Sequence, residues 1–95
     1  MKNNDLSGWR MKIDDVDNKL IKLLAKRNQI ARRIARTKMI FGIAVFDAER
    51  ETQVIRKRQE LASGFGLKKD FVQALMRLLM KASKEVQKEI MFSYK

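Results

Sequence analysis

The sequence predicts an all-α fold of three helices, one long and two shorter, and three observations support this prediction. The 95 residues include no proline and only four glycines, the two residue types that most disfavour helix interiors. Hydrophobic residues make up 45% of the chain and charged residues 35%, a balance typical of amphipathic helices rather than of disorder. Apolar side chains also recur at steps of three and four residues, the period of an α-helix. No linker divides the sequence, so we expect a single domain over residues 1–95.

The first expected helix runs from about residue 6 to residue 41. Its apolar stripe includes Ile13, Val16, Leu20 and Leu24. At the usual rise per residue this helix would be roughly 50 Å long, too long to be covered by the rest of so short a chain. Something else must cover its far end, and help from a partner chain is expected for a domain of this size.

The second expected helix covers residues 48–62. Gly42 supplies a break after the first helix, and Asp47 stands where an N-cap residue would begin the second. The loop between the two helices is short.

The third expected helix covers residues 69–91. Ser63, Gly64 and Gly66 punctuate the boundary before it, and Asp70 lies at its start. Its apolar pattern consists of Phe71, Leu75, Leu78, Leu79, Ala82, Val86 and Ile90.

Composition restricts the chemistry that this chain can perform. It contains no cysteine and no histidine, which excludes disulfides, the common zinc and haem sites, thiol nucleophiles and imidazole acid–base catalysis. Any catalysis must use carboxylates, amines, guanidinium groups or amides, and we expect no metal ion. The N-terminus lacks an apolar signal region, and no run approaches the roughly 18 apolar residues of a membrane span, which predicts a cytoplasmic protein.

The formal net charge of +11 arises from 22 basic and 11 acidic residues. Such an excess favours an anionic partner, and nucleic acid, anionic lipid and small polyanions all fit it.

Polar side chains interrupt the apolar stripes. On the first helix the stripe continues through Arg27 and Lys38 and, extended backwards, reaches Arg10, so three cations are expected on one inward face. On the third helix, Ser83 and Gln87 follow apolar residues on the same face. The stripe of the second helix passes through Asp47, Arg50 or Glu51, and Arg58.

Inward charges of this kind require compensation. An unpaired buried cation is costly, so it needs a carboxylate, hydrogen bonds or a bound anion. Only two carboxylates, those of Asp47 and Glu51, share faces with four cations, which leaves about two positive charges unmatched and favours a dianionic ligand. The four cations are Arg10, Arg27, Lys38 and Arg50. Any one of these basic side chains, taken alone, could instead extend along the stripe to water. The coincidence of three cations on one helix with two polar groups on another argues against that alternative.

The order and spacing of these residues form the most specific signal. The pattern runs from Arg10 through Ile13-Asp14-x-x-Asp17, Leu23-Leu24-Ala25-x-Arg27, Lys38 and Asp47-x-x-Arg50-Glu51 to Ser83-x-x-x-Gln87, without gaps over about 80 residues. In this pattern the chain resembles the all-α-helical chorismate mutases. The resemblance implies an intertwined homodimer, with Arg10 contributed across the interface to the active site of the other chain.

The resemblance also implies a reaction, which is the Claisen rearrangement of chorismate to prephenate in phenylalanine and tyrosine biosynthesis. This step is concerted and needs no cofactor. Arg27 and Arg10 of the partner subunit would bind the two substrate carboxylates. Lys38 and Gln87 would donate hydrogen bonds to the ether oxygen. The remaining matches are Asp47 and Glu51 for the substrate hydroxyl and neighbouring cations, Arg50 for ordering the site, and Ser83 for a carboxylate contact.

Three residues depart from the family pattern. Ala44 stands where the loop often has proline, so the loop is expected to be less rigid. Lys26 replaces a commonly acidic residue, and Lys84 replaces a frequently apolar one. A cation added beside Ser83 would alter substrate affinity or require a counter-ion.

Three other functions remain open. An isochorismate-pyruvate lyase of the same fold would bind a near-identical dianion, although Glu51 and Gln87 favour the mutase. A basic helical nucleic-acid-binding module would use the 18 basic residues that remain when the four site cations are set aside. Against this module, the basic residues are spread around the first helix, and only Trp9 and Tyr94 are non-core aromatics able to stack on bases. A purely structural dimer would leave the inward cations without a purpose. We therefore expect no nucleic-acid or membrane partner.

Overall fold

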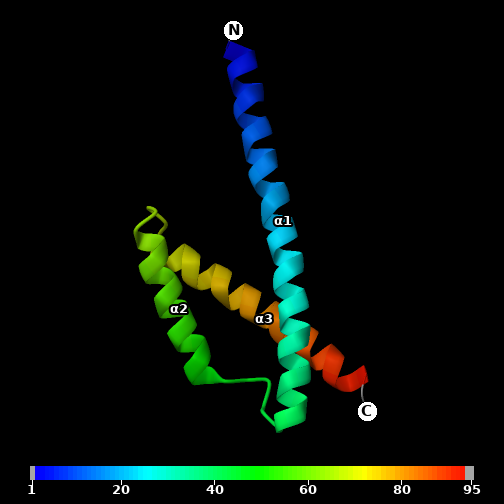
Figure 1. Ribbon diagram of the computed structural model, residues 1–95. Helices are drawn as coiled ribbons and strands as arrows, with labels where there is room; N and C mark the ends of the chain where they lie inside the picture. Colours follow the sequence, from blue (N-terminus) through cyan, green and yellow to red (C-terminus); the bar gives the residue numbers. More distant parts are fainter. Residues whose placement is uncertain (1, 94–95) are drawn as a thin grey trace. The chain divides into compact units, whose positions relative to one another are not determined.

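A computed structural model describes the backbone of residues 2–93 and the side chains of residues 5–93. Within this range there are three helices and no strand: α1 (Lys2–Phe41), α2 (Ala48–Ser63) and α3 (Lys69–Ser93) (Figure 1). The prediction of an all-α chain with one long and two shorter helices is confirmed. None of the helices in this range is long and apolar enough to cross a membrane.

Two compact units divide the chain, Met1–Ile30 and Ala31–Lys95, and their boundary falls inside α1. In the described residues, the first unit consists of the N-terminal part of α1. The second contains the end of α1 together with α2 and α3. The expectation of a single domain over residues 1–95 stays a prediction.

α1 ends in a conformation that favours glycine. Gly42 has a φ of +64°, in the left-handed region. The Gly42 N–H donates a hydrogen bond to the carbonyl oxygen of Met39 at 3.4 Å. The Ile43 N–H donates one to the carbonyl oxygen of Lys38 at 2.8 Å. This pair of bonds satisfies carbonyl groups that the end of a helix otherwise leaves without partners. The break predicted at Gly42 is confirmed.

α2 has specific caps at both ends. Asp47 Oδ1 accepts a hydrogen bond from the backbone N–H of Arg50 at 3.0 Å, which confirms the predicted N-cap. Beyond the other end, Gly66 has a φ of +77°, and the N–H of Leu67 bonds to the carbonyl oxygen of Ala62 at 3.1 Å. Backbone capping therefore defines where α2 starts and where it stops.

The core of the second unit lies between α2 and α3. A buried Val, Ile or Met side chain contributes about 1.5–3 kcal/mol to stability, so even a small core of this kind joins the two helices firmly. The buried residues are Val54, Ile55 and Ala62 from α2 and Val72, Met76 and Met80 from α3, with Leu79 packed against them.

The apolar pattern expected for α3 fits this core only in part. Phe71, Leu75 and Leu78 are exposed in the chain, whereas Met76 and Met80, which were not in the expected pattern, are buried. α3 is apolar over a wide arc, and the chain covers the side that contains the methionines. The sequence showed that α3 is amphipathic but did not show which part of its apolar arc meets α2.

α1 contributes two small buried residues to the second unit. Ala31 and Ala35 are 3% and 0% exposed, and their four-residue spacing puts them on one face of the helix. Because alanine projects only a methyl group, neighbouring atoms can approach the helix backbone closely here.

Candidate active site

Lys38 lies in the last turn of α1 and is half-buried. Its Nζ donates a hydrogen bond to the carbonyl oxygen of Val45 at 2.9 Å, which ties the loop after α1 to the end of that helix. The negative end of the helix dipole also favours a cation at this position. An ammonium has three N–H donors, so the group is held in place with donors left to bind an anion.

Asp47 and Arg50 lie at the start of α2, and both are exposed. One carboxylate oxygen of Asp47 already caps the helix by accepting the Arg50 N–H. The sequence placed Asp47 and either Arg50 or Glu51 on an inward-facing stripe. The structure does not show this for Asp47 or Arg50, because no side chain of the same chain covers them. Their contacts with a substrate stay predictions.

Glu51 is half-buried in the first turn of α2 and forms an ion pair with Lys84 of α3. The distance from Lys84 Nζ to Glu51 Oε2 is 2.9 Å. The same Nζ lies 4.7 Å from the centre of the Phe46 ring, a cation–π contact. Of the two consequences expected for a cation at position 84, altered affinity or pairing with a counter-ion, the structure shows the pairing, and the counter-ion is itself a candidate site residue.

Gln87 on α3 is 6% exposed, although its side chain is polar. Its Oε1 is buried and has no hydrogen-bond partner within the part of the chain that the structure describes. A buried amide oxygen without a partner costs about 1–3 kcal/mol, so a packing role alone does not explain a glutamine here. Ser83 lies one turn earlier on α3 and is half-buried. The prediction that polar groups occupy inward positions on α3 is confirmed for Gln87.

Arg10 and Arg27 belong to the first unit. Arg27 is half-buried, whereas Arg10 is exposed, so the inward position expected for Arg10 is not present within a single chain. The reason is that this unit consists of one helix, which has nothing of its own to cover that face. The apolar residues of the same stripe are exposed as well: Leu6, Ile13, Val16, Leu20 and Leu24.

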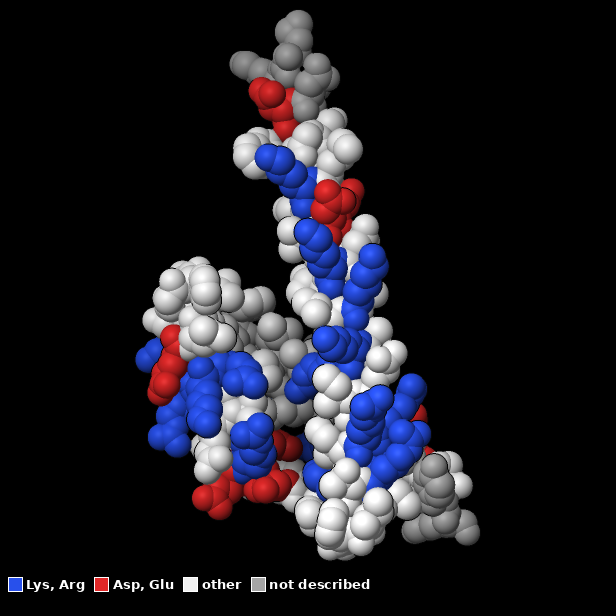
Figure 2. Space-filling view, in the orientation of Figure 1, with Lys and Arg blue, Asp and Glu red and all other residues white. Residues whose placement is uncertain are grey.

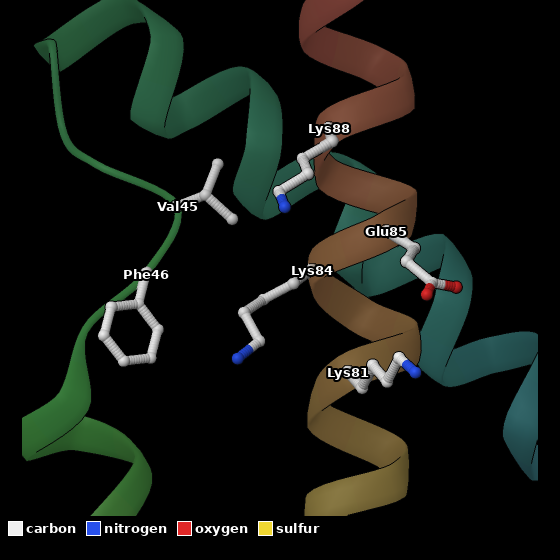
Figure 3. A pocket seen from close by; sticks show the side chains of 6 residues that line it. All are labelled: Val45, Phe46, Lys81, Lys84, Glu85 and Lys88. Atoms are coloured by element: carbon white, nitrogen blue, oxygen red, sulfur yellow. The ribbon is translucent and has the colours of Figure 1, made fainter.

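The second unit contains a pocket lined by residues of α3 and of the loop before α2 (Figure 3). Figure 3 shows the Lys84 side chain directed from α3 towards Phe46 in the loop between α1 and α2. The pocket has a volume of about 320 Å³ and is lined by Val45, Phe46, Lys81, Lys84, Glu85 and Lys88. None of the eight candidate site residues lines it, so this pocket was not predicted from the sequence. The only sequence signal for it was the cation at position 84.

Positive charge extends well beyond the candidate site. Figure 2 shows Lys and Arg side chains along the described length of α1 and over α2, with Asp and Glu among them on the face in view. Trp9, one of the two aromatics considered for base stacking, has Lys12 Nζ 4.5 Å from its ring centre. Tyr94, the other, lies outside the described residues.

A family model and several known proteins are similar to this chain. The family model for chorismate mutase type II matches residues 9–88, a range that includes all eight candidate site residues. The chorismate mutase of Methanocaldococcus jannaschii is 32% identical over 84 residues, which cover 88% of this chain and 85% of that protein.

Longer relatives show the same similarity over a part of their length. The bifunctional chorismate mutase/prephenate dehydratase of Buchnera aphidicola subsp. Acyrthosiphon pisum is 33% identical over 89 residues, which cover 94% of this chain but 23% of that protein. The T-protein of Enterobacter agglomerans is 30% identical over 79 residues, which cover 83% of this chain and 21% of that protein. The resemblance noted in the sequence is therefore confirmed, and the chain belongs to the type II chorismate mutases, a family of isomerases.

Proposed function

We propose that this chain is a chorismate mutase that converts chorismate to prephenate by a Claisen rearrangement. The observation that carries the proposal is the family match over residues 9–88, which contains every residue that the sequence pattern assigned to the site. Two features of the structure support it. The Lys38 ammonium is held by the carbonyl oxygen of Val45, and the polar side chain of Gln87 is buried on α3.

Substrate binding depends on arginine in this proposal. Arg27 of one subunit and Arg10 of the partner subunit bind the two carboxylates of chorismate, because the planar guanidinium group can donate two parallel hydrogen bonds to a carboxylate. The reaction requires the enolpyruvyl arm to fold over the ring. Holding both carboxylates keeps the flexible substrate in that conformation, so part of the entropic cost is met on binding.

Lys38 and Gln87 act on the bond that breaks. The C–O bond cleaves and the new C–C bond forms in one step, and negative charge grows on the ether oxygen. The Lys38 ammonium and the Gln87 amide N–H donate hydrogen bonds to this oxygen and stabilise the transition state more than the substrate. No group gains or loses a proton, so a chain without histidine or cysteine can perform the reaction. The supporting contacts come from Asp47 and Glu51 to the substrate hydroxyl, from Ser83 to a carboxylate, and from Arg50, which orders the site.

The proposed enzyme is a homodimer with intertwined first helices. Leu6, Ile13, Val16 and Leu20 follow one stripe of α1, and each is at least half exposed in the single chain. A continuous apolar surface of this kind marks an interaction site. A second copy has the same stripe and can pair with it symmetrically. Arg10 lies among these residues, so the same contact would carry it to the site of the partner subunit.

The proposal further places the reaction in phenylalanine and tyrosine biosynthesis in the cytoplasm, without a cofactor. Isochorismate-pyruvate lyase is the alternative within the same fold, and substrate assays separate the two activities. The purified protein is expected to consume chorismate and form prephenate, and to release no pyruvate from isochorismate.

The Lys38→Ala variant tests the mechanism. Loss of one donor to the developing charge is expected to lower kcat by about a hundredfold or more. Lys57→Ala, which removes an exposed lysine from α2, is the matched control and is expected to keep full activity. Circular dichroism and sedimentation should show that both variants keep the helical content and association state of the original protein. Full activity of Lys38→Ala, or salicylate formation from isochorismate without any prephenate from chorismate, would contradict the proposal.

A further inference from the structure

Lys84 occupies a position between three parts of the second unit. It belongs to α3, pairs with Glu51 in the first turn of α2, and lies over the ring of Phe46 in the loop before α2. The Lys84 and Glu51 side chains are 27% and 22% exposed, so the pair is only partly accessible to water. One side chain thus connects α3 to the segment that begins α2.

This ion pair is a poor candidate for a purely structural role. A single partly exposed Lys–Glu pair contributes little to stability, because solvent screens the attraction and two long side chains must be ordered. The helices it connects are already joined by the Val54, Ile55, Met76 and Met80 core. The pair therefore matters mainly for where it holds the Glu51 carboxylate and for the charge that it cancels.

We propose that Lys84 is a positioning residue that holds Glu51 in place and neutralises it beside the bound substrate. This inference rests on the proposed function, in which Glu51 binds the hydroxyl of a dianionic substrate. An isolated carboxylate near a dianion would repel it, whereas one paired with an ammonium does not. Lys84 engages Oε2 of Glu51, and Oε1 stays able to accept a hydrogen bond from a hydroxyl group.

The Lys84→Met variant tests this role, because methionine keeps much of the length of the side chain and removes its charge. We expect the KM for chorismate to rise about fivefold with kcat changed less than twofold, since the lost interaction acts on substrate and transition state alike. In about 1 M KCl, where charges are strongly screened, the KM of Lys84→Met should approach that of the original protein. Lys84→Arg keeps the charge and should restore the original KM.

Two further variants separate the positioning of Glu51 from a direct contact with the substrate and from general surface charge. In a Glu51→Gln background there is no carboxylate to hold or neutralise, so adding Lys84→Met should change KM no further. Lys81→Met removes an equal charge one turn earlier on α3, from a lysine that has no ion pair within residues 5–93, and should leave KM unchanged. Thermal melts and sedimentation should confirm that every variant keeps its fold and association state.

Three results would overturn the positioning role of Lys84, and a fourth would contradict the proposed function. A Lys84→Met enzyme with unchanged KM would overturn the positioning role. An equal rise in KM in the Glu51→Gln background would overturn it too, because Lys84 would then act on the substrate directly. An equal rise in KM in Lys81→Met would also overturn it, because the effect would then come from the loss of any positive charge on this surface. Absence of chorismate turnover by the original protein would contradict the proposed function itself, which is a different result from an active enzyme insensitive to Lys84.

Discussion

The two units of the chain differ in what they do with their apolar side chains. In Ala31–Lys95, α2 and α3 enclose a core, and Ala35 of α1 is fully buried. In the described part of Met1–Ile30 every apolar side chain is exposed, and Arg27 alone is half-buried. One unit has a core of its own, although Phe71, Leu75 and Leu78 stay exposed in it. The other is an amphipathic helix whose apolar face has no cover of its own.

This difference matters because the residues proposed for the site belong to both units. Lys38, Gln87 and the four supporting residues belong to the second unit, whereas Arg10 and Arg27 belong to the first. If a second copy covers the first unit, substrate binding and association use the same helix. The active site would then be complete only in the dimer, and mutations in the two units should have separable effects.

The largest effect is expected when two inactive variants, one changed in each unit, are mixed. Arg10→Ala, in the first unit, and Lys38→Ala, in the second, are each expected to lose about a hundredfold or more in kcat/KM. If each site takes Arg10 from one subunit and Lys38 from the other, a heterodimer of the two variants contains one intact site and one doubly defective site. Equal amounts unfolded and refolded together should recover about a quarter of the original activity, because half of the dimers are mixed.

The control for this experiment is the same procedure applied to each variant alone, which should recover nothing. Steady-state chorismate consumption at equal total subunit concentration is the measurement. An absence of complementation in refolded dimers would mean that Arg10 and Lys38 serve a site within one chain, or that Arg10 has no part in the site.

A charge placed on the exposed stripe should separate association from folding. Leu20→Glu puts a carboxylate on the apolar face of the first unit, where burial without a partner costs several kcal/mol. The dimer dissociation constant should rise by about a hundredfold or more, and activity should become dependent on protein concentration. Sedimentation over a range of concentrations measures both states.

Lys22→Glu is the matched control, because two residues along a helix place it roughly 200° around the axis from Leu20. It introduces the same carboxylate on an exposed position of α1 and should leave the dimer intact. An original protein that is monomeric and fully active at micromolar concentration would refute the dimer, whatever Leu20→Glu does.

The sequence predicted the backbone architecture better than the contacts within the site. The end of α1 and the start of α2 were predictable because Gly42 and Asp47 act through local backbone geometry, which depends on neighbouring residues only. The inward position of Gln87 was predictable from helical periodicity. The Lys38 contact was not predictable, because its acceptor is the backbone carbonyl of Val45 and any residue has one.

Contacts between helices were also not predictable from the apolar pattern of the sequence. For Lys84 the sequence offered a counter-ion as one of two possible consequences. It did not show which acidic residue would be the partner, because that depends on how α3 is rotated against α2. The same rotation determined that Met76 and Met80, rather than Leu75 and Leu78, form the core. Side-chain periodicity defines a face, and only packing against a particular neighbour selects the part of that face that is buried.

The smallest expected effect comes from one substitution made in each unit. Gly8 lies inside α1 with open space where a Cβ would be added, so Gly8→Ala should stabilise the protein by up to about 1 kcal/mol through helix propensity. Gly42 has equally open space but a φ of +64°, so Gly42→Ala should destabilise it by about 1 kcal/mol through backbone strain. Urea unfolding at a fixed protein concentration measures both changes. Changes of opposite sign in the free energy of unfolding would show that helix propensity dominates at position 8. They would also show that backbone conformation dominates at position 42, in the turn before the Lys38–Val45 contact. Equal signs would contradict the left-handed turn at Gly42.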